Sequence, residues 1–187
     1  MTSIADGIKV LKDVDRLAAL RKDLVGVRPS KLPLSHGCAV SNIKIEKCKY
    51  MDSKKLPLWL VFENPDKYAA DKDVYVIFKS GDDLRQDMLT LQMIRLMDKL
   101  WLADNLDLRM SPYGCVATGD EIGMIEVVLN SETTAKITKE AGGATAAFKS
   151  DPLVKWLKRQ NESTIEFDAA VDNFVRSCAG CKCCYYC

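Results

Sequence analysis

The N-terminal part of the chain alternates apolar and charged residues with the spacing of an α-helix. Its apolar positions are Ile4, Ile8, Leu11, Val14, Ala18 and Leu24. Charged residues lie largely on the other side, so the pattern predicts one amphipathic helix over residues 4–24. Gly26 and Pro29 are expected to end this helix, and the loop that follows reads as a linker.

The middle of the chain has the short apolar runs that are typical of strands. Residues 58–62 form one such run, and residues 74–78 are β-branched or aromatic throughout, which suits a strand buried on both faces. Residues 112–118 and 124–129 flank a Gly-Asp-Glu turn at 119–121, and together they predict a hairpin.

One helix is expected to interrupt these strands. Asp83 can cap its N-terminus, and Gln86, three residues later, completes a capping-box-like pair. The helix then continues for about five turns to Trp101 along one apolar face. That face consists of Leu84, Met88, Leu91, Ile94 and Met97.

The last third of the chain has a helical pattern. Ser131 is expected to cap a helix over 132–140, Pro152 to open a short helix and Thr164 to begin another. A glycine-containing loop at 141–144 separates the first two. An antiparallel sheet with one embedded helix, followed by further helices, predicts an α+β fold with two lobes.

Composition narrows the function classes. The 187 residues are 48% hydrophobic and 28% charged, so the chain can form a sizeable core and is not a disordered tail. A net charge of +1 gives no reason to expect nucleic acid as a partner. No uncharged apolar run approaches the roughly 18 residues of a transmembrane segment, and the charged N-terminus is unlike a secretory signal.

Five of the eight cysteines crowd into the last ten residues. They are Cys178, Cys181, Cys183, Cys184 and Cys187. Four of them recur at every third position, which invites an iron–sulfur or zinc interpretation, but the spacing matches neither kind of site. The last four residues also make a poor prenylation box. Out-of-frame or intron-derived translation explains this change of character better, and no metal site is predicted here.

Two charged side chains, Lys79 and Asp87, suggest a nucleotide-binding site, and each also has a purely structural explanation. Lys79, at the end of a predicted strand, can place a positive charge in a cleft beside a phosphate, or it can simply extend to water. Asp87, in the first turn of the next helix, can hold that lysine, or it can merely suit the helix dipole.

Two backbone segments are similarly ambiguous. Residues 124–128 can present the Glu126 carbonyl and the Val128 N–H to an adenine, or they can serve only as a strand-to-helix connector. The loop at 49–55, with Ser53 and several lysines, can cradle phosphate although it lacks the glycines of the usual fingerprints. It can equally be a solvated hairpin.

Taken together, these segments resemble the catalytic domain of the class I phosphatidylinositol 3-kinases. The stretches that carry the resemblance are 78–92 (FKSGDDLRQDMLTLQ), 57–60 (PLWL), 106–110 (LDLRM), 112–115 (PYGC), 123–128 (GMIEVV) and 177–180 (SCAG). The resemblance runs from about Pro33 to Gly180. Within it, residues 46–54 and 90–98 are most similar to the class IA beta isoform.

The resemblance implies a protein-kinase-like fold. Its amino-terminal lobe, an antiparallel sheet with one embedded helix, would be followed by a truncated helical carboxyl lobe. Four segments are implied: the end of a helical accessory domain and linker at 1–30, the amino-terminal lobe with the hinge at 31–130, the start of the carboxyl lobe at 131–180, and a divergent cysteine-rich tail at 181–187.

The resemblance also implies an ATP site. The matching positions are Lys79 and Ser53 at the phosphates, Met51 and Trp59 at the pocket wall, Asp87 and Tyr113 in a deeper affinity pocket, and Ile125, Glu126 and Val128 at the adenine-binding hinge. The implied reaction transfers the γ-phosphoryl group of ATP to the inositol 3-hydroxyl of a membrane phosphoinositide, with Mg²⁺ as cofactor. A regulatory subunit, bound through upstream domains, and a cytoplasmic location with recruitment to the plasma membrane are implied as well.

The sequence departs from the family after Gly180. No Asp-Phe-Gly follows, and the single histidine, His36, lies in the linker, so the catalytic loop and the Mg²⁺ ligands are expected to be absent. We therefore expect a fragment of an active lipid kinase that has no turnover on its own. The alternatives are a catalytically inactive nucleotide-binding or decoy splice form, and a non-functional product.

Overall fold

The computed structural model describes residues 1–28, 31–34, 39–142 and 151–186. His36, Cys38 and Cys187 lie outside these ranges, as do residues 143 and 144 of the predicted loop at 141–144.

The chain divides into two compact units. The first unit comprises residues 1–92 and 113–127, and the second comprises residues 93–112 and 128–187. The long helix α3 (Arg85–Ala103) begins in the first unit and ends in the second.

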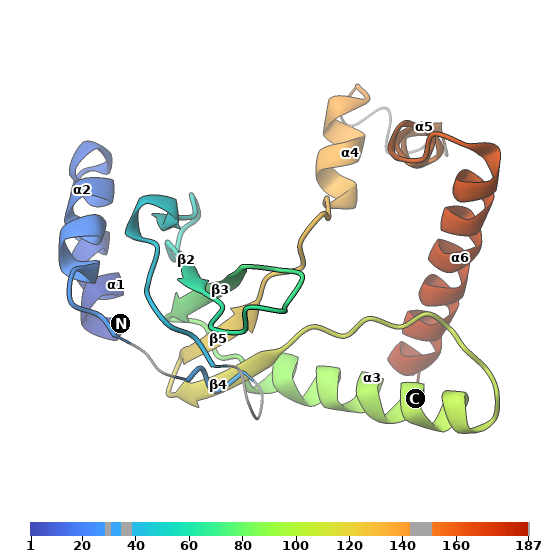
Figure 1. The fold of residues 1–187 in the computed structure, drawn as a ribbon, viewed down its shortest axis with the longest axis horizontal. Coiled ribbons are helices and arrows are strands. Elements are labelled where there is room, and N and C mark those ends of the chain that lie inside the picture. The colour runs from blue at the N-terminus through green and yellow to red at the C-terminus, as the bar shows by residue number, and fades with distance from the viewer. Residues whose placement is uncertain (29–30, 35–38, 143–150, 187) are drawn as a thin grey trace. The chain divides into compact units, whose positions relative to one another are not determined.

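A five-stranded sheet forms the centre of the first unit (Figure 1). The elements of this unit besides α3 are α1 (Thr2–Lys9), α2 (Asp13–Leu24), the 3₁₀ helix η1 (Ile45–Lys47), β1 (Lys49–Tyr50), β2 (Leu58–Glu63), β3 (Asp73–Ser80), β4 (Cys115–Gly119) and β5 (Ile122–Glu126). The strand order is β1-β2-β3-β5-β4, and every neighbouring pair is antiparallel. The predicted α+β fold, with one helix between the strands and a hairpin at 119–121, is confirmed.

One face of the sheet lies against the N-terminal helices. Because side chains alternate along a strand, the register places the apolar side chains of Leu58, Leu60, Val76 and Phe78 on this face. They share one buried core with residues of α1 and α2, the two helices that lie beside the sheet in Figure 1. The helical residues of that core are Ala5, Ile8, Leu20 and Leu24.

The opposite face is less deeply covered. It carries Trp59, Ile77, Lys79 and Ile125, all of intermediate burial. The prediction that the third strand is buried on both faces is therefore wrong for this face. β3 packs tightly only where α1 and α2 cover it, and three of the predicted site residues, Lys79, Trp59 and Ile125, lie on the other face of the sheet.

The predicted single helix over residues 4–24 is also wrong. The chain forms α1 and α2 with a break at residues 10–12, where Lys12 takes an extended conformation with ψ of 152°. Asp13 and Asp15 then occupy the first turn of α2, where acidic side chains suit the positive end of the helix dipole. The break allows Ile8 and Leu20 to reach the same core, which one straight helix would prevent.

The helix caps differ from the predictions in their partners. The Asp83 carboxylate accepts a hydrogen bond from the N–H of Arg85, the first residue of α3, at 3.0 Å, and its side-chain partner is Arg85 rather than the predicted Gln86. The cap of α4 (Thr134–Glu140) is Thr133, whose hydroxyl accepts from the Lys136 N–H. The predicted cap, Ser131, is wrong.

The second unit is built from helices. After α4 come α5 (Asp151–Gln160) and α6 (Thr164–Tyr186), as Pro152 and Thr164 predicted. A capping box, in which Ser163 and Glu166 exchange hydrogen bonds, starts α6. The helix continues through the cysteine-rich segment to Tyr186. None of the helices in the described ranges is both long and apolar enough to cross a membrane.

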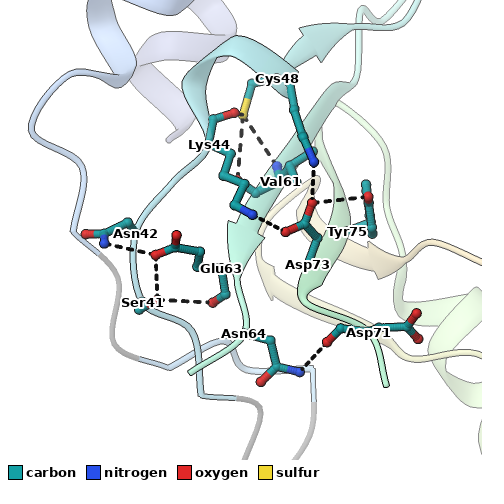
Figure 2. Close-up of polar contacts among 11 residues, drawn as sticks. Ser41, Asn42, Lys44, Cys48, Val61, Glu63, Asn64, Asp71, Asp73 and Tyr75 are labelled. Atoms are coloured by element: carbon teal, nitrogen blue, oxygen red, sulfur yellow. Dashed lines mark hydrogen bonds and ion pairs between the residues drawn. The ribbon is translucent and has the colours of Figure 1, made fainter. Parts of the chain in front are cut away.

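A polar cluster fixes the start of β3 to the segment that precedes β1. The Asp73 carboxylate forms ion pairs with the ammonium groups of Lys44 and Lys47, and it accepts a hydrogen bond from the Tyr75 hydroxyl at 3.4 Å (Figure 2). Hydrogen bonds from Lys44 and Lys47 lower the pKa of Asp73 to about 2. The Asp73 side chain is only 9% exposed, so its charge depends on these partners.

Asp73 gives stability a specific pH dependence. Its pKa is lower in the folded chain than its ordinary value of 3.8, so its contribution is present above about pH 4 and is lost as the pH falls towards 2. We predict that Asp73→Asn lowers the free energy of unfolding by about 1 kcal/mol at pH 7, and that this difference shrinks below pH 4. Urea unfolding at several pH values measures it. The control is Asp71→Asn at an exposed neighbouring position, and a difference that does not change with pH would contradict the assignment.

Gly123 is required by close packing at the position opposite Lys79. A Cβ atom at Gly123 would lie 2.4 Å from the Val116 carbonyl oxygen and 2.6 Å from Cδ1 of Leu84. We predict that Gly123→Ala lowers the free energy of unfolding by about 1–3 kcal/mol, because the Val116 backbone cannot yield cheaply. The matched control is Gly7→Ala in α1, where no atom lies within 4 Å of the added Cβ. Equal stability of Gly123→Ala and the unaltered chain would contradict this packing.

Candidate functional site

Lys79 lies near the end of β3, on the half-covered face of the sheet. Its side chain is 28% exposed, and its Nζ atom lies 3.1 Å from Oδ2 of Asp82 in an ion pair. Its partner in the register is Gly123 of β5. The lysine is thus held over the sheet by a carboxylate three residues later and does not extend freely into water.

The carboxylate that pairs with Lys79 differs from the expected one. Asp87 was a possible partner on sequence grounds, but it lies in the first turn of α3 with an exposed side chain, and the ion pair forms with Asp82. Asp82 lies in the turn between β3 and α3. Its backbone N–H donates to the Glu121 carbonyl at 3.2 Å, as does that of Gly81 at 2.7 Å. The turn is therefore fastened to the β4–β5 hairpin.

The loop between β1 and β2 approaches the same turn. The Met51 N–H donates to the Pro57 carbonyl at 2.8 Å, and the Leu56 N–H donates to the Ser53 carbonyl at 3.1 Å, which closes the loop on itself. The Lys55 ammonium donates to the Gly81 carbonyl. Met51 and Ser53 are exposed at the tip of this loop. Lys55 consequently brings the candidate phosphate loop beside the turn that holds Lys79.

Trp59 supplies a flat apolar surface on the same face. It pairs with Ile77 across β2 and β3, and its ring meets the Tyr75 ring edge to face, with centroids 6.1 Å apart. The Lys49 ammonium lies 5.1 Å from the centroid of the Trp59 ring, within the range of a cation–π contact. These contacts fix the indole ring on the sheet surface.

The end of β5 holds the hinge candidates. Ile125 is opposite Ile77 in the register and packs against the buried side chains of Leu84, Leu91 and Cys115. Glu126 is on the other face. Its N–H donates to the Gly114 carbonyl at 2.8 Å, and its carboxylate accepts from the Gly114 N–H at 2.7 Å.

Tyr113 and Val128 are the remaining predicted site residues. Tyr113 directly precedes Gly114, the residue that is hydrogen-bonded to Glu126, and it is 36% exposed. Val128 belongs to the second unit and is exposed, and its carbonyl accepts from the Ser131 hydroxyl at 2.7 Å.

The structure thus gathers some predicted site residues and leaves others apart. Lys79, Trp59 and Ile125 share one sheet face, and the loop of Met51 and Ser53 reaches the turn beside Lys79. Asp87 is nearby in sequence but is exposed on α3. Lys55 was expected only as one of several lysines in the loop at 49–55, and Asp82 was not predicted as a site residue. A lysine-rich loop and two consecutive aspartates after a strand-end lysine were the available signals.

Charges of both signs meet at this turn. Lys55 and Lys79 place two ammonium groups at the turn, while Asp82 is engaged by Lys79 and Asp83 by Arg85. Hydrogen bonds from the side chain and backbone of Arg85 lower the pKa of Asp83 to about 2, so its carboxylate is ionised. A phosphate could replace Asp82 as the partner of Lys79.

Throughout the described ranges, no three His, Cys, Asp or Glu side chains converge in a way that could hold a metal ion. Cys178, Cys181 and Cys183 are exposed on α6.

Comparison with known proteins connects this geometry to one family. The family model for phosphatidylinositol 3- and 4-kinase matches residues 73–186, and so extends past Gly180, where the sequence resemblance was expected to stop. Phosphatidylinositol 3-kinase 1 of Dictyostelium discoideum is 57% identical over 184 residues, which cover 96% of this chain and 12% of that protein. Phosphatidylinositol 3-kinase 2 of the same organism is 55% identical over 150 residues, which cover 80% of this chain and 8% of that protein.

The chain therefore spans about an eighth or less of the length of these curated relatives. The family model, in contrast, covers well over half of the chain, including β3, α3 and the β4–β5 hairpin, on which the candidate site is built. This chain belongs to the phosphatidylinositol 3- and 4-kinase family.

Proposed function

We propose that the sheet face bearing Lys79 binds ATP, and that this chain is the nucleotide-facing part of a phosphatidylinositol 3-kinase catalytic domain. The whole protein would transfer the γ-phosphoryl group of ATP to the inositol 3-hydroxyl of a membrane phosphoinositide. The observation that carries the proposal is the half-buried Lys79, ion-paired to Asp82 on the same face as Trp59 and Ile125.

The proposed role of Lys79 is to neutralise phosphate charge. A triphosphate offers more negative charge than the single Asp82 carboxylate, so the ammonium can exchange one partner for the other with little movement of the strand. Lys55 and the backbone N–H groups of the loop around Ser53 would contact the phosphates from the other side. The chain's contribution to the reaction is thus to position the phosphates and stabilise their charge.

The proposed role of the apolar residues is to hold the adenine. Trp59, Ile77 and Ile125 give the sheet face an apolar surface of the kind that lines nucleotide pockets. The Glu126 carbonyl and the Val128 N–H would read the adenine edge. Met51 would close the wall, and Asp87 and Tyr113 would line the deeper pocket.

The finer assignments are part of the same proposal. Class I, with greatest similarity to the class IA beta isoform, is supported by residues 46–54 and 90–98. We also propose ATP with Mg²⁺ as cofactors, which the family membership supports. A regulatory subunit as partner and a cytoplasmic location with recruitment to the plasma membrane complete the proposal. No specific feature of the described residues favours an inactive decoy.

Removal of the Lys79 ammonium tests the proposal. We predict that Lys79→Ala weakens ATP binding to this chain at least tenfold in isothermal titration calorimetry, because the phosphates lose their main cationic partner. In the whole enzyme the same substitution should abolish lipid phosphorylation. The matched control is Lys72→Ala, an exposed lysine just before the same strand, which should bind ATP normally. Equal ATP affinity of Lys79→Ala and the folded, unaltered chain would contradict the proposed site.

A further inference from the structure

The end of β3 extends beyond the support of its neighbour β2. The last pair between β2 and β3 joins Leu58 to Phe78, whereas Lys79 and Ser80 continue and pair only with Gly123 and Ile122 of β5. Strand ends that are paired on one side only tend to fray. The strand segment that carries Lys79 therefore needs another partner on the side where β2 is missing.

Helix α1 supplies that partner. The Lys9 ammonium donates to the Ser80 carbonyl oxygen at 3.0 Å, and its Nζ atom lies 3.4 Å from the Ser80 hydroxyl oxygen. The Ser80 hydroxyl donates to the Asp6 carboxylate at 3.1 Å, and Asp6 also forms an ion pair with Lys9 at 3.0 Å. Ser80 is only 7% exposed. Asp6 and Lys9 thus bond both polar oxygens of a buried residue.

The packing of α1 against the sheet anchors the contact of Asp6 and Lys9 with Ser80, which we call the Ser80 clamp. Ala5 directly precedes Asp6, and Ile8 directly precedes Lys9. Both apolar side chains are buried in the core that α1 shares with the sheet. Asp6 and Lys9 are three residues apart and so lie on one side of the helix. The hydrogen bonds to Lys9 and Ser80 lower the pKa of Asp6, so its carboxylate remains ionised.

The Ser80 clamp lies on the sheet face opposite the candidate site. Because side chains alternate along a strand, Ser80 faces α1 while Lys79 faces Trp59 and Ile125. Lys9 and Asp6 therefore act on Lys79 only through the backbone. They hold the carbonyl one residue after Lys79 and so limit how far its side chain can move.

We propose that Lys9, oriented by Asp6, is a positioning residue that holds the end of β3 so that the Lys79 ammonium meets the phosphates of ATP. The proposal rests on the proposed function. It gives the N-terminal helix an indirect role in phosphate binding. The resemblance of the sequence assigns phosphate contacts only to Lys79 and Ser53.

The test compares ATP with adenosine, which lacks the phosphates. We expect Lys9→Met to weaken ATP binding about three- to tenfold in calorimetry and to leave adenosine affinity within twofold, because only the phosphates depend on Lys79. Lys9→Arg keeps the charge and should restore ATP affinity to within twofold. The control is Lys12→Met, an exposed lysine in the loop after α1, which should bind both ligands as the unaltered chain does.

A second variant covers the case in which Lys9→Met does not fold. Asp6→Asn keeps the size of the side chain but removes the charge that orients Lys9, and it should weaken ATP binding at least twofold without changing adenosine binding. Circular dichroism verifies that each variant is folded.

The outcomes separate the two proposals. If ATP and adenosine weaken equally, or if neither changes in Lys9→Met and Asp6→Asn, the positioning role is overturned while the ATP site stands. If the folded, unaltered chain binds no ATP, or if Lys79→Ala binds it normally, the proposed function fails and the positioning role fails with it.

Discussion

The central constraint on this chain is the support of a strand end. Lys79 lies in the part of β3 that extends beyond its last pair with β2. Its position therefore depends on the pairing with Gly123 on one side and on the hydrogen bonds from α1 to Ser80 on the other. The turn that follows is fastened separately to Glu121 and Lys55. Three segments that are distant in sequence, α1, the loop between β1 and β2 and the β4–β5 hairpin, thus determine where one ammonium group lies.

The two faces of the sheet have different tasks. One face is apolar and closed by α1 and α2, and this core makes the sheet a stable platform. The other carries half-buried aromatic, aliphatic and charged side chains, which suits a surface that must remain able to bind a ligand. Gly123 belongs to this second face, where the absence of a side chain allows Leu84 to pack closely against the sheet beside Lys79.

Sequence patterns were informative where the cause of structure is local. The β-branched run at 74–78 and the capped, apolar-faced helix after Asp83 were predicted because short-range periodicity and capping decide them. The break between α1 and α2 was missed, since it depends on how both helices reach one core. The contacts of Lys79 with Asp82, of Lys55 with Gly81, and of Lys9 with Ser80 depend on turn geometry or tertiary packing, which periodicity does not report.

The central claim is that Lys79 exchanges a carboxylate for phosphate. A crystal structure of the chain with a non-hydrolysable ATP analogue tests it most directly. The account predicts that the Lys79 ammonium leaves Asp82 and lies about 2.8 Å from a phosphate oxygen, with the adenine beside Trp59 and Ile125. An analogue bound elsewhere, with the ion pair between Lys79 and Asp82 intact, would contradict it.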